Sequence, residues 1–594
     1  MSFGRWRFVL WAVAVLAVVA WSYWPLLDAG FVWVDNILFQ NAAWLRYGDS
    51  WKDRLFHNFY DWINYFRPLA VGFWVAQARA FDAAPQPMHT ISLALHLANT
   101  LLVGVLGLRL TASRESAPAR AATMCIAMLL YGVHAASIEP VAWISSQAEM
   151  LATFFMLLGL LLNSTVRHPI IRAAAVAVCF FLAACAKESA AAFPLLLVLF
   201  DAVQDDRDAG FATRVRAIWA RQRLVYAGVF AAGLGYLALR YWGLGFLLQP
   251  SSAQSLPYFS RLQTVSYLYV TYWRIILWPM YELGPLHLID TRQFDGLHWK
   301  QAGIDLTAIA IVATASYLAW KRKPLGFLVL AASAALLPVL HVIPVAFDAS
   351  LYHERYAMTA IAAACALLPR TLSAITLRGS RWRPWLAIAS MVMAAWLVLG
   401  LVNIRVTLPL WTDEIKLWTW VLQRYPTYDL AQSHLLTAYG QAGDRLHAHE
   451  IADLLIARQP HCGDCMLNVA ALAVEDADVP RLKAALENAR QTFGDTPNKR
   501  AWQAYLIAVG QLHELQGEPQ EAVSAYQQAI RVEPLDPMAR MDLALLQARQ
   551  GYPVEARNNM DVAITLFAPE QRARREKEFA HVLELSQISN PARP

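Results

Sequence analysis

Charged side chains are scarce in this 594-residue chain, because only 16% of its residues are Asp, Glu, Lys or Arg. Soluble domains usually carry about 25% charged residues. Hydrophobic residues make up 57% of the sequence, which excludes an intrinsically disordered protein and disfavours an ordinary soluble enzyme. We therefore expect a protein whose apolar surface lies in a membrane.

The few charges are unevenly distributed along the chain. Residues 1–410 contain 32 basic and 20 acidic residues, whereas residues 411–594 contain 18 basic and 24 acidic ones. We predict two domains with these bounds, a basic polytopic membrane domain (1–410) and an acidic domain of soluble composition (411–594). A nucleic-acid partner is not expected, because the soluble part is net negative.

Long apolar runs in the first domain predict an all-α bundle of about eleven transmembrane helices. The expected spans are 8–27, 88–110, 121–138, 148–166, 170–186, 189–203, 224–244, 304–320, 325–341, 356–368 and 384–404. The first run has no small-residue cleavage pattern, so we expect an uncleaved anchor. We interpret residues 261–279, rich in Tyr and Trp, as a helix lying in the membrane interface.

The distribution of Lys and Arg predicts the orientation of the bundle. Short segments on one side hold 19 of the 32 basic residues, which places the N-terminus in the cytoplasm. An odd number of crossings then puts residues 411–594 on the outer side of the membrane.

Three glycines indicate a repeat in the second domain. Gly551 lies 34 residues after Gly517, which is the tetratricopeptide period, and the 74 residues from Gly443 to Gly517 fit two repeats with an insertion of six. The best copy is Ala501–Pro534. We expect an α-solenoid of three to four repeats that holds a protein or peptide.

Cysteine is rare as well, with six residues in the whole chain. Four of them fall in predicted membrane helices. Cys462 and Cys465 form a lone CxxC, which lacks the second pair of a zinc site. On the outer side of a membrane we expect a disulfide between them, and a redox role is the alternative.

Ionisable residues near the outer ends of the predicted spans are the candidate site. Such residues are costly at a membrane and mark function by default. The group comprises Asp35, Arg67, His89, His134, Glu139, Lys187, Glu188, His353, Glu354 and Arg355. The alternatives are snorkelling for the basic residues, packing for the histidines and helix capping for Glu139. The sequence does not support a nucleotide-binding motif. An HExxH zinc motif beginning at His353 is also not supported, since position 357 is Ala.

Several motifs together resemble the transmembrane and tetratricopeptide-repeat O-mannosyltransferase family of the glycosyltransferase C superfamily. The motifs are Phe31-Val-Trp-Val-Asp35, Tyr65-Phe-Arg67-Pro68, Val133-His134, Glu139-x-Val-Ala-Trp143, Lys187-Glu188, Leu277-Trp278-Pro279, Val342-Ile-Pro344 and Glu354-Arg355-Tyr356. They follow the family order over essentially the whole chain.

The resemblance implies a glycosyltransferase C-like bundle in a bacterial inner membrane, with periplasmic repeats. It implies transfer of a hexose, such as mannose, from a polyprenyl-phosphate donor to a hydroxyl of a protein acceptor, with inversion at the sugar. Asp35 and Glu139 match the family's acids, and Arg67, Lys187 and Arg355 suggest groups that bind donor phosphate. We expect His89, His134, Glu188, His353 and Glu354 to position substrate. The chemistry is consistent, since attack by an alcohol needs a base and a phosphate leaving group needs cations.

The sequence departs from the family pattern at two places. Val34 stands where a second acid is common, and the family's HPxHTE reads His134-Ala-Ala-Ser137-Ile-Glu139. The missing histidine removes one ligand from a divalent metal site, and a divalent metal cofactor is kept as an alternative. The alternatives are a lipid or glycan acceptor, a non-enzymatic membrane-anchored repeat scaffold, and a transporter, whose ionisable groups would lie near the bilayer midplane.

Overall fold

The computed structural model of the chain describes residues 3–40, 45, 49, 51–57, 65–111, 116–248, 257–280, 283–296, 298–342, 350–376, 383–493, 499–534, 536–567 and 569–589. All regular elements in these ranges are helices, and an isolated antiparallel bridge joins Leu288 to Ser350. The all-α class predicted from the sequence is confirmed. The motif residues 343–345 fall outside the described ranges.

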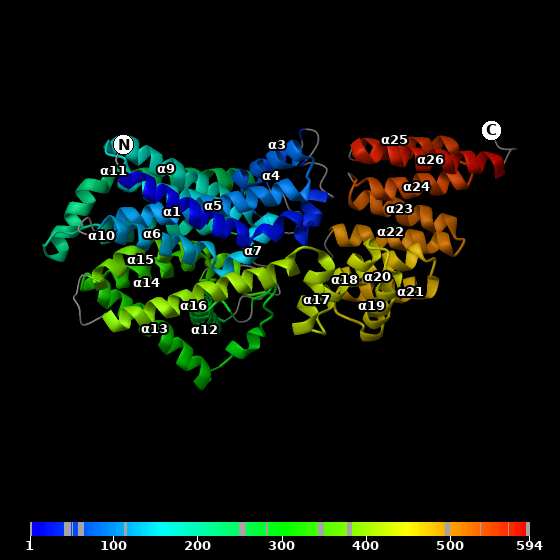
Figure 1. Cartoon of the computed structure of the whole chain (residues 1–594). Coiled ribbons are helices and arrows are strands. Elements are labelled where there is room, and N and C mark those ends of the chain that lie inside the picture. Colours follow the sequence, from blue (N-terminus) through cyan, green and yellow to red (C-terminus); the bar gives the residue numbers. More distant parts are fainter. Residues whose placement is uncertain are drawn as a thin grey trace. The chain divides into compact units, whose positions relative to one another are not determined.

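Backbone contacts divide the chain into two compact units (Figure 1). We call Met1–Phe39 and Asp49–Asp413 the bundle unit, and Gln40–Gly48 and Glu414–Pro594 the repeat unit. The sequence placed the boundary between residues 410 and 411.

Helices of very different length build the bundle unit. The α-helices are α1 (Phe3–Ser22), α3 (Trp51–Phe56), α4 (Pro68–Phe81), α5 (Pro85–Leu110), α6 (Ala117–Gly132), α7 (Ile138–Ala142), α8 (Gln147–Thr165), α9 (Pro169–Ala186), α10 (Phe193–Val203), α11 (Phe211–Leu244), α12 (Tyr258–Leu277), α13 (Trp299–Trp320), α14 (Pro324–Leu336), α15 (Met358–Thr376) and α16 (Arg383–Thr407). Short 3₁₀ segments used below are η4 (Ile144–Ser146), η5 (Glu188–Ala192) and η8 (Glu354–Ala357). Helix α9 packs against α8 and α11, and α5 packs against α6, α8 and α15.

Seven helices in the described residues are long and apolar enough to cross a membrane, or eight if the bent pair Ala117–Gly132 and Ala135–Ala142 counts as one span. The prediction of about eleven is therefore too high by this criterion. Phe8–Ser22 and Pro324–Val339 are apolar but shorter, and α10 has only 11 residues. At 1.5 Å per residue, α10 is far too short for about 30 Å of hydrocarbon. Helix α12 is also outside this set, and its predicted place in the membrane interface stays a prediction.

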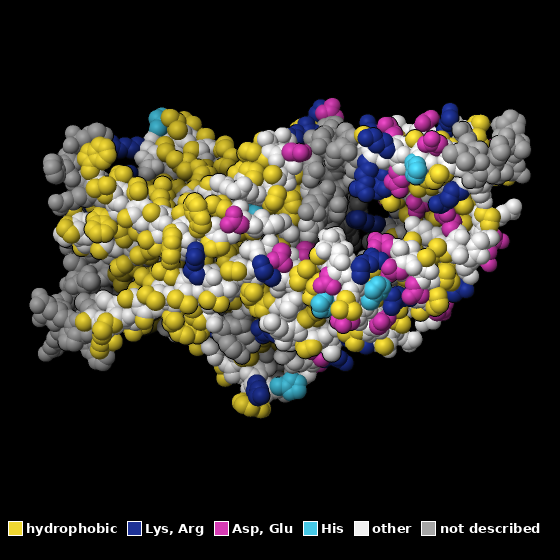
Figure 2. All heavy atoms as spheres, turned by 45° about the vertical axis from the view of Figure 1, so that its right-hand side comes forward, with side chains coloured by type: hydrophobic (Ala, Val, Ile, Leu, Met, Phe, Trp, Pro, Cys, Tyr) yellow, Lys and Arg dark blue, Asp and Glu magenta, His cyan; other side chains and the backbone are white. Residues whose placement is uncertain are grey.

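The surfaces of the two units differ in composition (Figure 2). Hydrophobic side chains dominate the visible face of the bundle unit, whereas acidic and basic side chains alternate over the repeat unit. The exposed large hydrophobic residues include Phe230 on α11, Leu306 on α13 and Val392 on α16. Such faces are what a helix presents to lipid.

The repeat unit consists of paired helices that follow α17 (Glu414–Arg424). The pairs are α18 (Asp429–Gln441) with α19 (Arg445–Arg458), α20 (Gly463–Glu475) with α21 (Val479–Thr492), α22 (Lys499–Leu515) with α23 (Pro519–Val532), and α24 (Pro537–Arg549) with α25 (Pro553–Leu566). Helix α26 (Pro569–Ser589) follows and contacts α24 and α25. These four helix–turn–helix pairs are tetratricopeptide-like repeats.

Each pair turns through a residue with positive φ. The predicted glycines, Gly443, Gly517 and Gly551, have φ of 76°, 74° and 80°. The turn of the second pair uses Ala477, with φ of 55°, which lies 34 residues after Gly443. Glycine favours this conformation because it has no Cβ, so a search for glycine misses the alanine.

Close helix packing explains the small residues of the best repeat. A Cβ at Gly510 on α22 would lie 2.5 Å from the ring of Tyr526 on α23, so only glycine fits there. Tyr526, Ala522 and Ala529 are fully buried. In the second pair a disulfide joins Cys462 to Cys465 at the start of α20.

Candidate functional site

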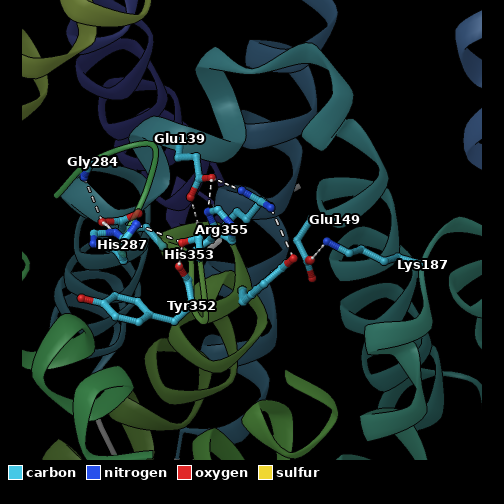
Figure 3. Close-up of polar contacts among 11 residues, drawn as sticks. Glu139, Glu149, Lys187, Gly284, His287, Tyr352, His353 and Arg355 are labelled. Carbon is cyan, nitrogen blue, oxygen red and sulfur yellow. Dashed lines mark hydrogen bonds and ion pairs between the residues drawn. The ribbon is translucent and has the colours of Figure 1, made fainter. Parts of the chain in front are cut away.

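Most of the ionisable residues of the candidate site lie in connections and short 3₁₀ segments of the bundle unit, whereas His89 lies near the start of α5 and Glu139 lies in α7. These connections follow the C-terminal ends of α1, α6 and α9 and precede the N-terminal ends of α4, α8 and α15. Figure 3 shows Glu139, Arg355, Glu149 and Lys187 converging from separate elements. Residues far apart in sequence therefore meet in one polar network.

The centre of the network is an ion pair between Glu139 and Arg355. The Arg355 guanidinium contacts Oε1 of Glu139, and the Arg355 backbone N–H donates to Oε2 at 2.9 Å. The two side chains are only 3% and 8% exposed, and Nδ1 of His353 lies 3.4 Å from the same carboxylate. Glu139, predicted as a catalytic acid, and Arg355, predicted to bind phosphate, therefore form an ion pair with each other.

Tyr356 lies between two of the predicted cations. The Cζ of Arg355 and the Nζ of Lys187 are each 4.7 Å from the Tyr356 ring centroid. The Arg355 guanidinium also donates to the Tyr356 hydroxyl at 3.3 Å. Two of the three cations predicted from the sequence therefore contact the same aromatic ring, whereas Arg67 lies over the ring of Tyr65, 3.8 Å from its centroid.

Lys187 is paired with a carboxylate that the sequence reading did not place in the site. Its Nζ lies 2.5 Å from Glu149, a side chain only 1% exposed, and the Ser189 hydroxyl donates to the same carboxylate at 2.9 Å. The available signal was a glutamate at the start of an apolar run, where burial demands a partner.

Two guanidinium groups share the carboxylate of Glu188. Arg67 lies 2.9 Å from Oε2, and Arg240 of α11 lies 3.6 Å from Oε1. Burial would raise the pKa of Glu188, but the adjacent Arg67 guanidinium holds it below its ordinary value. Arg240 was missed in the sequence, although a lone arginine inside the predicted span 224–244 was the signal. This cluster has a surplus of positive charge, which suits an anionic ligand.

Asp35 is fully buried and bonded to the start of η4. Its carboxylate accepts hydrogen bonds from the backbone N–H of Ile144 at 3.0 Å and of Ser145 at 2.9 Å, and from the Ser145 hydroxyl at 2.5 Å. Asp35 therefore also fixes the connection between α7 and α8. The three donors fix the orientation of the carboxylate.

Glu354 contacts a histidine that the sequence reading missed. The imidazole of His287 lies 2.9 Å from Oε1 of Glu354, and the backbone N–H of Gly284 donates to that oxygen at 3.2 Å. The His287 ring stacks on Tyr352 with centroids 4.2 Å apart. Glu354 thus connects the segment that follows α12 with η8. No sequence motif indicated a role for His287.

Two predicted substrate-positioning histidines serve the backbone instead. His89 hydrogen-bonds the Gly30 carbonyl at 3.1 Å. His134 bonds the Ile276 carbonyl at 3.1 Å and accepts from the backbone N–H of Ala136. Both are buried, and these contacts fit the packing alternative, while their predicted role in positioning substrate stays a prediction.

The described residues contain no group of three or more His, Cys, Asp or Glu side chains arranged to hold a metal ion. The site instead combines paired cations, buried carboxylates and aromatic rings, an arrangement suited to binding an anion and accepting a proton.

Comparisons with known proteins add little to this geometry. No protein-family model and no curated protein matches the chain. Among solved structures, the chain is similar to one from the crystal structure of the APC/C hetero-tetramer Cut9–Hcn1. The identity is 11%, the match covers 87% of this chain and 89% of that chain, and the TM-score is 0.25. A TM-score this low does not establish a shared fold. The assignment of tetratricopeptide-like repeats depends on the helix pairs and their turns.

Proposed function

We propose that the chain is a membrane glycosyltransferase that moves a sugar from a polyprenyl-phosphate donor to a hydroxyl of a protein acceptor. The observation that carries the proposal is the placement of Lys187 and Arg355 against the Tyr356 ring and of Arg67 against Glu188, among buried carboxylates in an apolar helical bundle. A lipid-linked phosphate needs both features, an apolar surface for its chain and cations for its head.

In the proposed reaction the acceptor oxygen attacks the anomeric carbon as the bond from that carbon to the phosphate oxygen breaks. Asp35 takes the hydroxyl proton as the new bond forms, and the lipid phosphate leaves with the bonding electrons. The cations stabilise the charge that develops on the phosphate. Attack opposite the leaving group gives inversion. The surplus charge at Arg67 and Arg240 makes that cluster the best place for the phosphate to enter.

The position of these groups also favours an enzyme over a transporter. They lie at helix ends and in connecting segments, whereas a transporter binds its substrate near the middle of its helices. The proposed orientation, with the site and the repeats in the periplasm, follows from the distribution of Lys and Arg in the sequence. The repeats would then raise the effective concentration of the protein acceptor, because they are tethered to the membrane domain.

The test is incubation of the purified protein with a panel of polyprenyl-phosphate sugars and protein acceptors, following release of free lipid phosphate. We expect release with one sugar, and loss of release in Arg67→Gln. Arg292→Gln is the matched control, because Arg292 is 86% exposed and pairs with Asp290, two residues before it. Release that depends on a lipid or glycan acceptor instead would identify the alternative acceptor class.

A second candidate function is a non-enzymatic scaffold that anchors the repeats. The pairing of Arg67, Lys187 and Arg355 with glutamates favours it, because such pairs also serve to join helices. A scaffold would release no lipid phosphate with any donor.

A further inference from the structure

An aromatic stack lies beside the Glu139–Arg355 pair. The indole rings of Trp33 and Trp143 are within 12° of parallel, with centroids 4.9 Å apart. The guanidinium of Arg355 lies 4.7 Å from the Trp143 ring centroid, and the His353 ring lies 6.4 Å from Trp33. The stack therefore joins the segment preceding Asp35 to the cationic centre of the site.

The backbone at Trp33 is held in an unusual conformation. Its φ is 56°, in the left-handed region that bulky residues avoid. Such strain persists only where the surroundings impose it, and it clusters at ligand sites. The conformation places the indole of Trp33, which is half-buried, on Trp143.

Three buried polar atoms next to the stack have no hydrogen-bond partner among the described residues. They are Nε1 of Trp143, whose residue is 8% exposed, and both ring nitrogens of His353, whose residue is 2% exposed. Buried polar groups are almost always paired in folded proteins, so each such atom calls for a partner. A bound ligand with hydroxyl groups supplies one.

Nε1 of Trp143 and Nε2 of His353 have opposite hydrogen-bonding character. The Trp143 indole N–H is a donor only. Nδ1 of His353 lies 3.4 Å from the Glu139 carboxylate, which favours the proton on Nδ1 and leaves Nε2 as an acceptor. A donor and an acceptor beside an aromatic face match a sugar, whose ring has an apolar C–H face and hydroxyl groups at its edge.

We infer that Trp33, Trp143 and His353 form the subsite for the pyranose ring of the donor. The ring lies against the aromatic stack, one hydroxyl oxygen accepts from Nε1 of Trp143, and one hydroxyl donates to Nε2 of His353. This inference rests on the proposed function, because it assigns the sugar of the same lipid-linked donor. These are positioning residues that hold the anomeric carbon near Asp35.

The test compares binding of undecaprenyl phosphate with binding of undecaprenyl phosphate mannose to the detergent-solubilised full-length protein by calorimetry. We expect the wild type to bind the sugar-bearing lipid about tenfold more tightly. Trp33→Ala should bring that ratio close to one while leaving the affinity for sugar-free lipid phosphate unchanged. Trp143→Phe, which keeps the ring and removes the N–H, should give an intermediate ratio.

The outcomes separate the two proposals. If the wild type binds neither lipid, the proposed function fails and the subsite fails with it. If the wild type prefers the sugar-bearing lipid and Trp33→Ala and Trp143→Phe both keep the full ratio, the subsite is wrong and the function stands. Trp299→Ala is the control, because Trp299 is 81% exposed at the start of α13 and should not alter either affinity.

Discussion

Replacing Glu139 and Arg355 singly and together separates a structural ion pair from a catalytic one. Both side chains are buried, so each single change leaves the partner charged in a water-poor environment. Removing one member of a buried pair costs about 3–5 kcal/mol of stability. Replacing both members by neutral residues leaves no uncompensated charge. The double change therefore lowers the free energy of unfolding by far less than the sum of the two single changes.

The variants are Glu139→Gln, Arg355→Met and the double variant. If each single change costs about 3 kcal/mol, additivity predicts about 6 kcal/mol for the double, whereas we expect about 2–3 kcal/mol. The coupling is thus about 3 kcal/mol. The Arg355 backbone N–H bond to Glu139 limits the loss in Glu139→Gln, because the amide oxygen still accepts it.

The assays are thermal unfolding of the full-length protein in detergent and release of lipid phosphate. If the pair has a role in turnover, the double variant regains stability and stays inactive. If the pair only joins helices, stability and activity return together. Additive stability losses, with coupling below about 0.5 kcal/mol, would refute the argument that the two charges depend on each other.

Four further predictions follow from individual residues. Asp35→Asn should abolish lipid-phosphate release and lower the free energy of unfolding by about 1–3 kcal/mol, because the amide cannot accept all the hydrogen bonds of the carboxylate. Ser145→Ala should lower it by only about 1 kcal/mol, and thermal unfolding measures both variants. Burial, then a nearby glutamate, raises the pKa of Asp542 from 3.8 to about 7, so the folded state keeps a proton that the unfolded chain releases, and stability falls as the pH rises between these values. Asp542→Asn should abolish this fall, on the order of 2–4 kcal/mol, when unfolding is measured at pH 5 and pH 8. Ala477→Gly should raise the stability of the repeat unit by about 0.5–1 kcal/mol, read as slower hydrogen exchange in the second helix pair, because glycine relieves the positive φ. Deletion of Pro426–Pro594 should raise KM for a protein acceptor more than for a short peptide in steady-state kinetics, and equal loss on both would contradict a docking role.

The sequence alone placed most of the long helices, although it predicted none at α3 or α4. Helix formation depends on neighbouring residues, so apolar runs and a 34-residue period suffice to place the bundle and the repeats. It did not give span lengths reliably, since breaks such as η5 before α10 shorten helices without a change in hydrophobicity. It also missed Ala477, because the turn needs a backbone conformation rather than a particular residue.

Only the tertiary structure decided which charges meet. Glu139 and Arg355 are 216 residues apart, and Arg67 and Glu188 are 121 residues apart. Their pairing depends on how distant helices pack, which no local pattern encodes. For the same reason the sequence named Arg67, Lys187 and Arg355 but neither Glu149 nor His287, since a buried charge gains its role from a partner that packing brings to it.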